Sequence, residues 1–182
     1  MPETGLKIRV FGDTVLRKKA KTVKKITDYH RDILSKMARL MYDSTGIGLA
    51  APQVGISEAM IVLDIGDGLY KLVNPKIVRK EGFQAIQEGC LSVPGVCLKV
   101  KRAKKVSVGA LDENGEHIFI EASELLACVL QHEIDHLNGR LIVDYSSVFN
   151  RLKISKKLKK LQKESSYEKL PEPEAKSCKL QL

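Results

Sequence analysis

The chain has 182 residues, 43% of them hydrophobic, which suits one hydrophobic core and a single domain. No stretch reaches 18 apolar residues, and the N-terminus lacks a cationic segment followed by an apolar one, so we expect no membrane span and no secretory signal. The formal net charge of +9 is concentrated in residues 151–182. Four cysteines without the spacing of a disulfide framework fit a reducing compartment, and we expect a cytoplasmic protein. The four cysteines are Cys90, Cys97, Cys128 and Cys178.

The first third of the chain predicts a strand, a helix and a glycine-rich turn. Residues 7–23 combine a short apolar run with basic residues and predict an opening strand and loop. In residues 27–43 apolar side chains recur every three or four positions, and Thr27 or Asp28 can cap the N-terminus, so an amphipathic helix is expected. It should end where residues 46–53, GIGLAAPQ, begin. That segment lacks the lysine of a phosphate-binding loop and by itself favours an ordinary turn between a helix and a strand.

The middle of the chain predicts strands, followed by a second helix. The apolar runs 60–63 and 69–73 flank a turn rich in Asp and Gly and predict a hairpin. More strands are expected within 96–108 and at 117–120, with the Asp-Glu-Asn-Gly sequence of residues 112–115 as the turn between them.

Residues 123–137 predict a helix that stops at Asn138-Gly139. Strands around one central helix indicate an α+β fold: small antiparallel sheets packed on that helix, with an N-terminal helix and a basic C-terminal helix.

The central helix carries a pattern typical of a hydrolytic metal site in residues 131–136, QHEIDH. At about 100° per residue, His132 and His136 lie about 40° apart on one helix face, so both imidazoles can bind one metal ion. Glu133 lies roughly 100° from His132, beside the ion, where a carboxylate can take a proton from bound water. The alternative is a surface helix that matches this short pattern by chance.

A third ligand decides between these interpretations. Metalloproteases with this helix pattern take theirs from downstream, but after His136 the chain has no further His and only scattered Glu. Upstream, in residues 88–95, EGCLSVPG, Cys90 follows a Gly and precedes a Pro-Gly turn that could aim a thiolate. A lone cysteine is more often a small buried apolar residue, so this segment alone leaves both interpretations open.

Together, residues 46–53, 88–95 and 131–136 resemble the three signature motifs of peptide deformylase. These are Gly-x-Gly-Leu-Ala-Ala-x-Gln, Glu-Gly-Cys-Leu-Ser and Gln-His-Glu-x-Asp-His, and all three are complete here. The likeness runs from about Leu6 to Tyr145. It implies a metal-dependent hydrolase that removes the formyl group from the N-terminal formylmethionine of nascent polypeptides and releases formate.

The resemblance also implies a ligand set. Cys90, His132 and His136 would hold one divalent metal ion, with a fourth position left to water, and Glu133 would accept the proton of that water. One thiolate with two imidazoles suits several metals, among which spacing cannot choose. Resemblance favours Fe²⁺, with Zn²⁺, Ni²⁺ or Co²⁺ as possible occupants.

Substrate contacts follow from the same resemblance. The side-chain amide of Gln53 and the backbone N–H of Leu91 match the groups that stabilise negative charge on the formyl oxygen. Backbone groups of Ile47, Gly48 and Gly89 match positions that pair with the substrate's main chain as a strand would.

An apolar strip along the metal-bearing face of helix 123–137 predicts a pocket for the methionine side chain. It consists of Leu125, Cys128 and Val129, about 20°, 40° and 60° from His132 on the helical wheel. By resemblance, Ile47 and Ile86 would complete the slot. A pocket wall and a packed core look alike in sequence, so ordinary core residues are the alternative.

The chain departs from the family pattern near the site. Some members carry an Arg where this chain has Cys97, and many carry one where it has Cys128. Both departures concern substrate affinity rather than the reaction. Arg102 is nearby and is interpreted either as a structural ion-pair partner or as a substitute substrate contact.

The basic C-terminal segment has two interpretations. Residues 151–182 hold ten Lys or Arg and four Glu, which gives +6 of the +9. We predict a catalytic domain over 1–147 and a basic helix with a disordered tail over 148–182, disordered beyond Lys169. The helix either lies solvated on the body or contacts ribosomal RNA, and we expect a monomer with no membrane partner. From residues alone, a metalloprotease that does not need Cys90, or an RNA-binding protein that does not need Glu133, are the rival functions.

Overall fold

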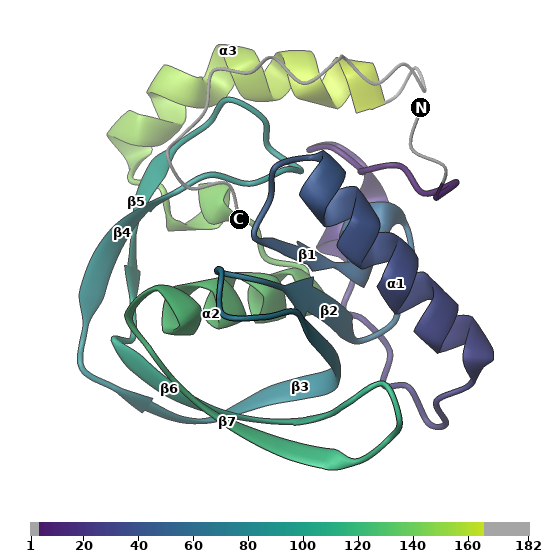
Figure 1. Cartoon of the computed structure of the whole chain (residues 1–182). Helices are drawn as coiled ribbons and strands as arrows, with labels where there is room; N and C mark the ends of the chain where they lie inside the picture. Colours follow the sequence, from purple (N-terminus) through teal and green to yellow (C-terminus); the bar gives the residue numbers. More distant parts are fainter. Residues whose placement is uncertain (1–3, 166–182) are drawn as a thin grey trace.

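The computed structural model describes residues 4–165, which form an α+β fold with two antiparallel sheets (Figure 1). The larger sheet has the strand order β1-β2-β3-β6-β7, and the smaller one pairs β4 with β5. The strands are β1 Gly48–Ala50, β2 Met60–Leu63, β3 Tyr70–Glu81, β4 Gln84–Glu88, β5 Leu98–Arg102, β6 Lys105–Leu111 and β7 His117–Ser123. The helices are α1 Asp28–Asp43, α2 Glu124–Leu137 and α3 Val148–Ser165, with short 3-10 helices η1 Thr14–Arg17, η2 Ala51–Val54 and η3 Ile142–Tyr145. The predicted fold class is confirmed.

Helix α2 lies at the centre of the molecule, between α3 and the β6–β7 hairpin in Figure 1. Its residues 127–130 are fully buried, in agreement with their almost continuous apolar sequence. Ser123 is the N-cap residue. The helix ends where Gly139 takes a positive φ of 71°, and a Cβ there would come within 2.7 Å of the Arg17 carbonyl oxygen. The predicted helix and its stop at Asn138-Gly139 are confirmed.

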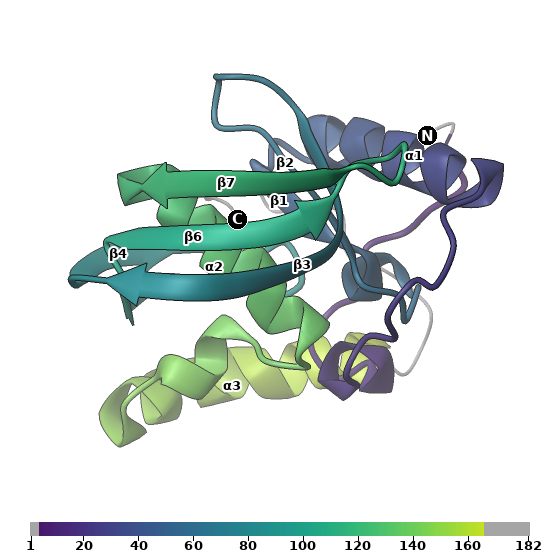
Figure 2. The same cartoon turned by 90° about the horizontal axis from the view of Figure 1, so that it is seen from below.

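Strand β2 is buried on both faces because α1 packs on one side of it and α2 on the other, whereas Figure 2 shows no helix over the outer face of β3, β6 and β7. Met60 and Val62 pack in the cluster that holds the apolar side of α1, whereas Ile61 and Leu63 pack in the cluster around α2. This double burial explains the unbroken apolar run of the strand. The predicted first helix and the β2–β3 hairpin are both confirmed, and of the two candidate caps Thr27 is the N-cap, while Asp28 is the first residue of the helix.

The opening strand predicted in residues 7–23 is wrong. Apart from an isolated bridge between Lys21 and Glu58, the segment pairs with no strand. Instead, Arg9 N–H donates to the Gln53 carbonyl and Phe11 N–H to the Ser92 carbonyl, at 2.6 and 2.8 Å. The segment thus joins two motif regions rather than extending one sheet, a tertiary effect that no local pattern reveals.

The prediction for residues 96–120 is confirmed in outline. The predicted region 96–108 divides at Ala103 and Lys104 into β5 and the start of β6, and the turn at 112–115 connects β6 to β7. Strand β4 was not predicted, although Gln84–Glu88 alternates in burial along the strand and pairs with β5 over its whole length.

Helix α3 confirms the predicted basic C-terminal helix and lies on the body of the protein. Leu158 and Leu161 are buried in a cluster with Leu141 and Val100. Lysines occupy much of the outer face. The predicted tail beyond Lys169 lies outside the described residues, as does Cys178. Within residues 4–165, no helix is both long enough and apolar enough to span a bilayer.

Candidate metal centre

Two imidazoles from α2 converge on one point. His132 and His136 are one helical turn apart and buried, with exposed fractions of 2% and 1%. Their Nε2 atoms lie 3.2 Å apart. The i, i+4 spacing predicted from the sequence therefore places both rings on the same side of the helix, with the same nitrogen atom facing inward.

The sulfur of Cys90 completes the group from a different part of the chain. Cys90 follows β4, and its backbone carbonyl accepts from Val93 N–H at 2.9 Å, which closes a tight turn under the side chain. Its Sγ lies 3.3 Å from His136 Nε2. The three ligand atoms all lie within 4.8 Å of one another, and they form the one group of this kind found in residues 4–165.

The hydrogen bonds around these atoms fit a bound cation. His132 Nδ1 lies 2.9 Å from a Glu88 carboxylate oxygen, which can only accept, so Nδ1 carries the proton and Nε2 presents its lone pair. Burial raises the pKa of Cys90 to about 12, and burial followed by the neighbouring His132 lowers the pKa of His136 well below its ordinary value. A cation among these donors would favour the thiolate and the neutral imidazoles, and one sulfur with two nitrogens suits zinc, iron, cobalt or nickel.

Glu133 is buried beside this point without a hydrogen-bond partner. Its exposed fraction is 0%, and neither carboxylate oxygen has a partner among the described residues. Burial, reinforced by the charge of Glu88, raises its pKa well above the ordinary value. An unpaired buried carboxyl is costly and is typical of a group kept for proton transfer.

A glycine of β1 gives the carboxyl of Glu133 its space. A Cβ built on Gly48 would collide with a carboxylate oxygen of Glu133 and lie 2.9 Å from its carboxyl carbon. The GIGLAAPQ segment contains β1, a short buried strand that packs on α2. The turn that this sequence favours by itself therefore describes only part of the segment.

We predict that Gly48→Ala lowers kcat for the formylated peptide that the resemblance implies as substrate on the order of 100-fold, because the methyl group displaces Glu133 from the ligand atoms. Steady-state kinetics at equal metal content would measure the loss. Gly109→Ala is the matched control, since a Cβ there meets no atom within 4 Å. Equal kinetics for the two variants would contradict this account of Gly48.

Gln53 reaches the sulfur from η2. Its Nε2 donates to Ser92 Oγ at 3.2 Å and contacts Cys90 Sγ at 3.7 Å, while its Oε1 accepts from Ala50 N–H at 2.8 Å. The side chain is fully buried. Leu91, directly after Cys90, is partly buried. The structure therefore brings Gln53 to the Cys90 sulfur from a separate segment, whereas Leu91 is the chain neighbour of Cys90.

The predicted pocket residues fall into two groups. Ile47, Ile86 and Leu125 are partly exposed and pack on the cluster around α2. Cys128 and Val129 are fully buried, and the Cys128 thiol donates to Glu88 at 3.1 Å. Gly89 is buried beside Cys90.

Glu88 and Ser92 are site residues that the sequence interpretation did not assign. Glu88 belongs to the cysteine motif, so an unassigned acid in a signature segment was the available signal. Arg102 contacts it with two parallel hydrogen bonds of 2.7 and 2.8 Å and also donates to Asp135. Burial raises the pKa of Glu88, but the bonds from Arg102 and His132 outweigh it and hold the pKa at about 2. Of its two predicted roles, Arg102 therefore has the structural one.

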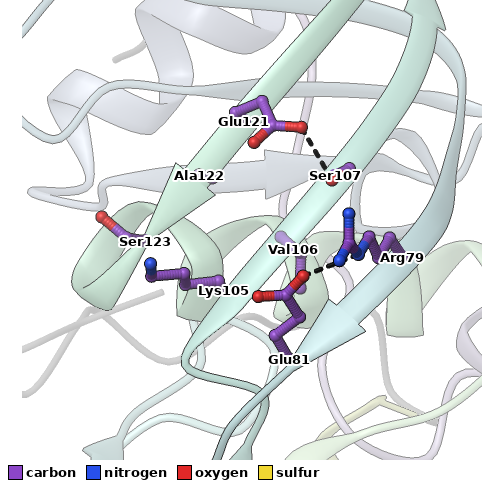
Figure 3. Close-up of a pocket in the computed structure, with 8 residues that line it drawn as sticks. All are labelled: Arg79, Glu81, Lys105, Val106, Ser107, Glu121, Ala122 and Ser123. Carbon is purple, nitrogen blue, oxygen red and sulfur yellow. Dashed lines mark hydrogen bonds and ion pairs between the residues drawn. The ribbon is translucent and has the colours of Figure 1, made fainter.

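A separate depression of about 280 Å³ lies on the outer face of β3, β6 and β7 (Figure 3). Four of its polar side chains form two pairs: Arg79 pairs with Glu81 at 2.6 Å, and Ser107 donates to Glu121 at 3.1 Å. It shares no lining residue with the metal centre, and α2 lies behind the sheet.

Comparison with known proteins places this geometry in a family. A model of the polypeptide deformylase family matches residues 6–152. A peptide deformylase of Thermoanaerobacter pseudethanolicus is 53% identical over 137 residues, or 75% of this chain and 86% of that protein. The structure of a Legionella pneumophila peptide deformylase gives a TM-score of 0.82 at 43% identity, over 91% of this chain and 99% of that one. One from Synechococcus elongatus, solved with actinonin, gives 0.81 at 45% identity, over 88% and 87% of the two chains.

The fold and the matches define a metal-dependent hydrolase. The chain belongs to the peptide deformylase family, whose members remove the N-formyl group from nascent peptides.

Proposed function

We propose that Cys90, His132 and His136 hold the metal ion and that Glu133 moves the proton of the reaction. The observation that supports this most strongly is the unpaired, buried Glu133 carboxyl beside three converging ligand atoms. These three residues would hold a divalent ion, which when bound would lower the pKa of a water molecule and so supply the nucleophile for the formyl carbon. Glu133 accepts the proton of that water and returns it to the departing amine, which leaves formate and a free N-terminus.

Gln53 and Leu91 are proposed to stabilise the charge that develops on the formyl oxygen. The Gln53 amide is held by Ala50 and Ser92, so it needs little reorganisation during the reaction. The backbone N–H of Leu91 is the second donor. Such donors act best where water is excluded, and Gln53 is fully buried.

The methionine side chain and the peptide backbone have separate proposed contacts. Ile47, Ile86 and Leu125 form the accessible wall of the methionine slot, with Cys128 and Val129 as buried support behind them. Gly48 and Gly89, with the backbone of Ile47, are proposed to pair with the substrate main chain.

We propose Fe²⁺ as the native ion, with Zn²⁺, Ni²⁺ or Co²⁺ able to occupy the same donors. The test measures formate release from formyl-Met-Ala-Ser. Protein as purified, without added metal, is expected to lose this activity faster in air than nickel-loaded protein, whereas an anaerobic sample should retain it. Equal decay of the two in air would contradict iron. The unformylated peptide, which has no formyl group to release, is the substrate control.

The basic face of α3 is proposed to contact ribosomal RNA. Leu158 and Leu161 face the body, which leaves Lys156, Lys159 and Lys163 exposed. Co-sedimentation with ribosomes that weakens steeply with salt would support this contact. We further propose a cytoplasmic location, where polypeptides emerge from ribosomes, and a monomer, because one chain supplies every proposed site residue.

A further inference from the structure

A line of hydrogen-bonded side chains runs from the metal centre to the surface. Its first member, Glu88, accepts from His132 Nδ1 and thereby sets the orientation and the protonated nitrogen of that ring. Two residues at its outer end, Asp135 and Tyr145, have no part in the reaction proposed above. Asp135 nevertheless belongs to the QHEIDH motif.

We propose that Asp135 and Tyr145 are positioning residues for His132, acting through Arg102 and Glu88. The inference rests on the proposed metal ligands.

Arg102 links the inner and outer halves of this line. Nε and Nη2 of its guanidinium hold both oxygens of Glu88, so the carboxylate cannot rotate without breaking a bond. The remaining Nη1 donates to Asp135 Oδ2. Arg102 is 5% exposed and Glu88 0%. Loss of a hydrogen bond to either side chain therefore costs free energy, because water cannot replace the lost partner.

Tyr145 fixes the outer end. Its hydroxyl donates to the same Asp135 Oδ2 at 2.7 Å, and its ring centroid lies 4.9 Å from the guanidinium carbon of Arg102. The Tyr145 side chain thus restrains both the Asp135 carboxylate and the Arg102 guanidinium.

Tyr145 is itself held in place by η3. Asp144, the preceding residue, accepts from Arg17 at 2.6 Å and from Leu141 N–H at 2.9 Å. Each link in the line is a charged or charge-assisted contact with fixed geometry, so a change at Tyr145 reaches the His132 ring through direct contacts.

The test compares nickel loss to a chelator from Tyr145→Phe and from the unchanged protein. The substitution keeps the ring near Arg102 and removes the hydroxyl, which bonds to Asp135 and also contacts the side chain of Arg140. We expect nickel loss to be about tenfold faster, at the lower end of the effect of losing a ligand's supporting partner. Asp135→Asn should change the rate in the same direction. KM should stay unchanged while kcat falls.

Tyr42→Phe is the matched control, since the Tyr42 hydroxyl donates to Asp64 at the same 2.7 Å outside this network. Its nickel loss should equal that of the unchanged protein. Urea unfolding of the metal-free variants separates general destabilisation from positioning. If Tyr145→Phe lost nickel no faster than Tyr42→Phe, the proposal would be overturned.

A double variant tests the route. If Tyr145 acts through Glu88, adding Tyr145→Phe to Glu88→Gln should not accelerate nickel loss further. Full multiplication of the two effects would overturn that route. Failure of the unchanged protein to bind one nickel ion per chain would instead reject the proposed ligands.

Discussion

Replacement of Glu133 by glutamine is expected to lower kcat for formyl-Met-Ala-Ser by about 10,000-fold, the upper end of what a positioned acid–base group supplies. Glutamine has nearly the same volume, so it fits the space left by Gly48, and the three ligand atoms stay as they are. Its amide cannot carry the proton from water to amine. Formate release measures the loss, and metal analysis should still find one ion per chain.

Glu133→Asp is the matched control because it keeps the carboxyl and shortens its reach by one methylene. Its kcat should fall between those of the unchanged protein and Glu133→Gln. If Glu133→Gln retained full activity at full metal content, another group would have to move the proton. The expected loss of activity in Glu133→Gln would also decide against a non-catalytic RNA-binding role, for which Glu133 is dispensable.

Elements with a strong repeat were predictable because their residues report local geometry. The three- and four-residue spacing of Ile33, Leu34 and Met37 gave α1, and the apolar runs of β2 and β3 gave their hairpin. The strand predicted in residues 7–23 was wrong because backbone N–H groups of this segment bond to the carbonyls of Gln53 and Ser92, which are far away in sequence. Strand β4 was missed because only two of its five residues are apolar.

The site was predictable to the extent that one helix or one motif contains it. The spacing of His132 and His136 is a local property of α2, whereas the approach of Cys90 depends on how β4 meets that helix. The spacing of residues left the role of Cys90 open, and the family resemblance assigned it as the third ligand. The contacts of Arg102 with Glu88 and Asp135 join three elements, so the sequence alone could not decide between its two roles. Periodicity also could not separate accessible Leu125 from buried Val129, because both lie on the same side of α2.

Cys90→Ala is expected to remove the metal ion and, with it, essentially all deformylation. Two buried imidazoles would remain, and the loss of affinity should exceed the roughly 10–100-fold that the loss of a supporting partner costs. Metal content after gel filtration measures this directly. Cys97→Ala, which removes a thiol of the same β4–β5 connection, should retain one ion per chain.

The Cys90 result also separates the two hydrolases that share a histidine-bearing helix. A metalloprotease with its third ligand after the helix would keep its ion in Cys90→Ala, and a deformylase built as proposed would not. Metal loss with Cys90→Ala and metal retention with Glu133→Gln would together divide the site into the group that binds the ion and the group that uses it. An ion retained at full occupancy in Cys90→Ala would show that the 3.3 Å approach of its sulfur to His136 is ordinary packing.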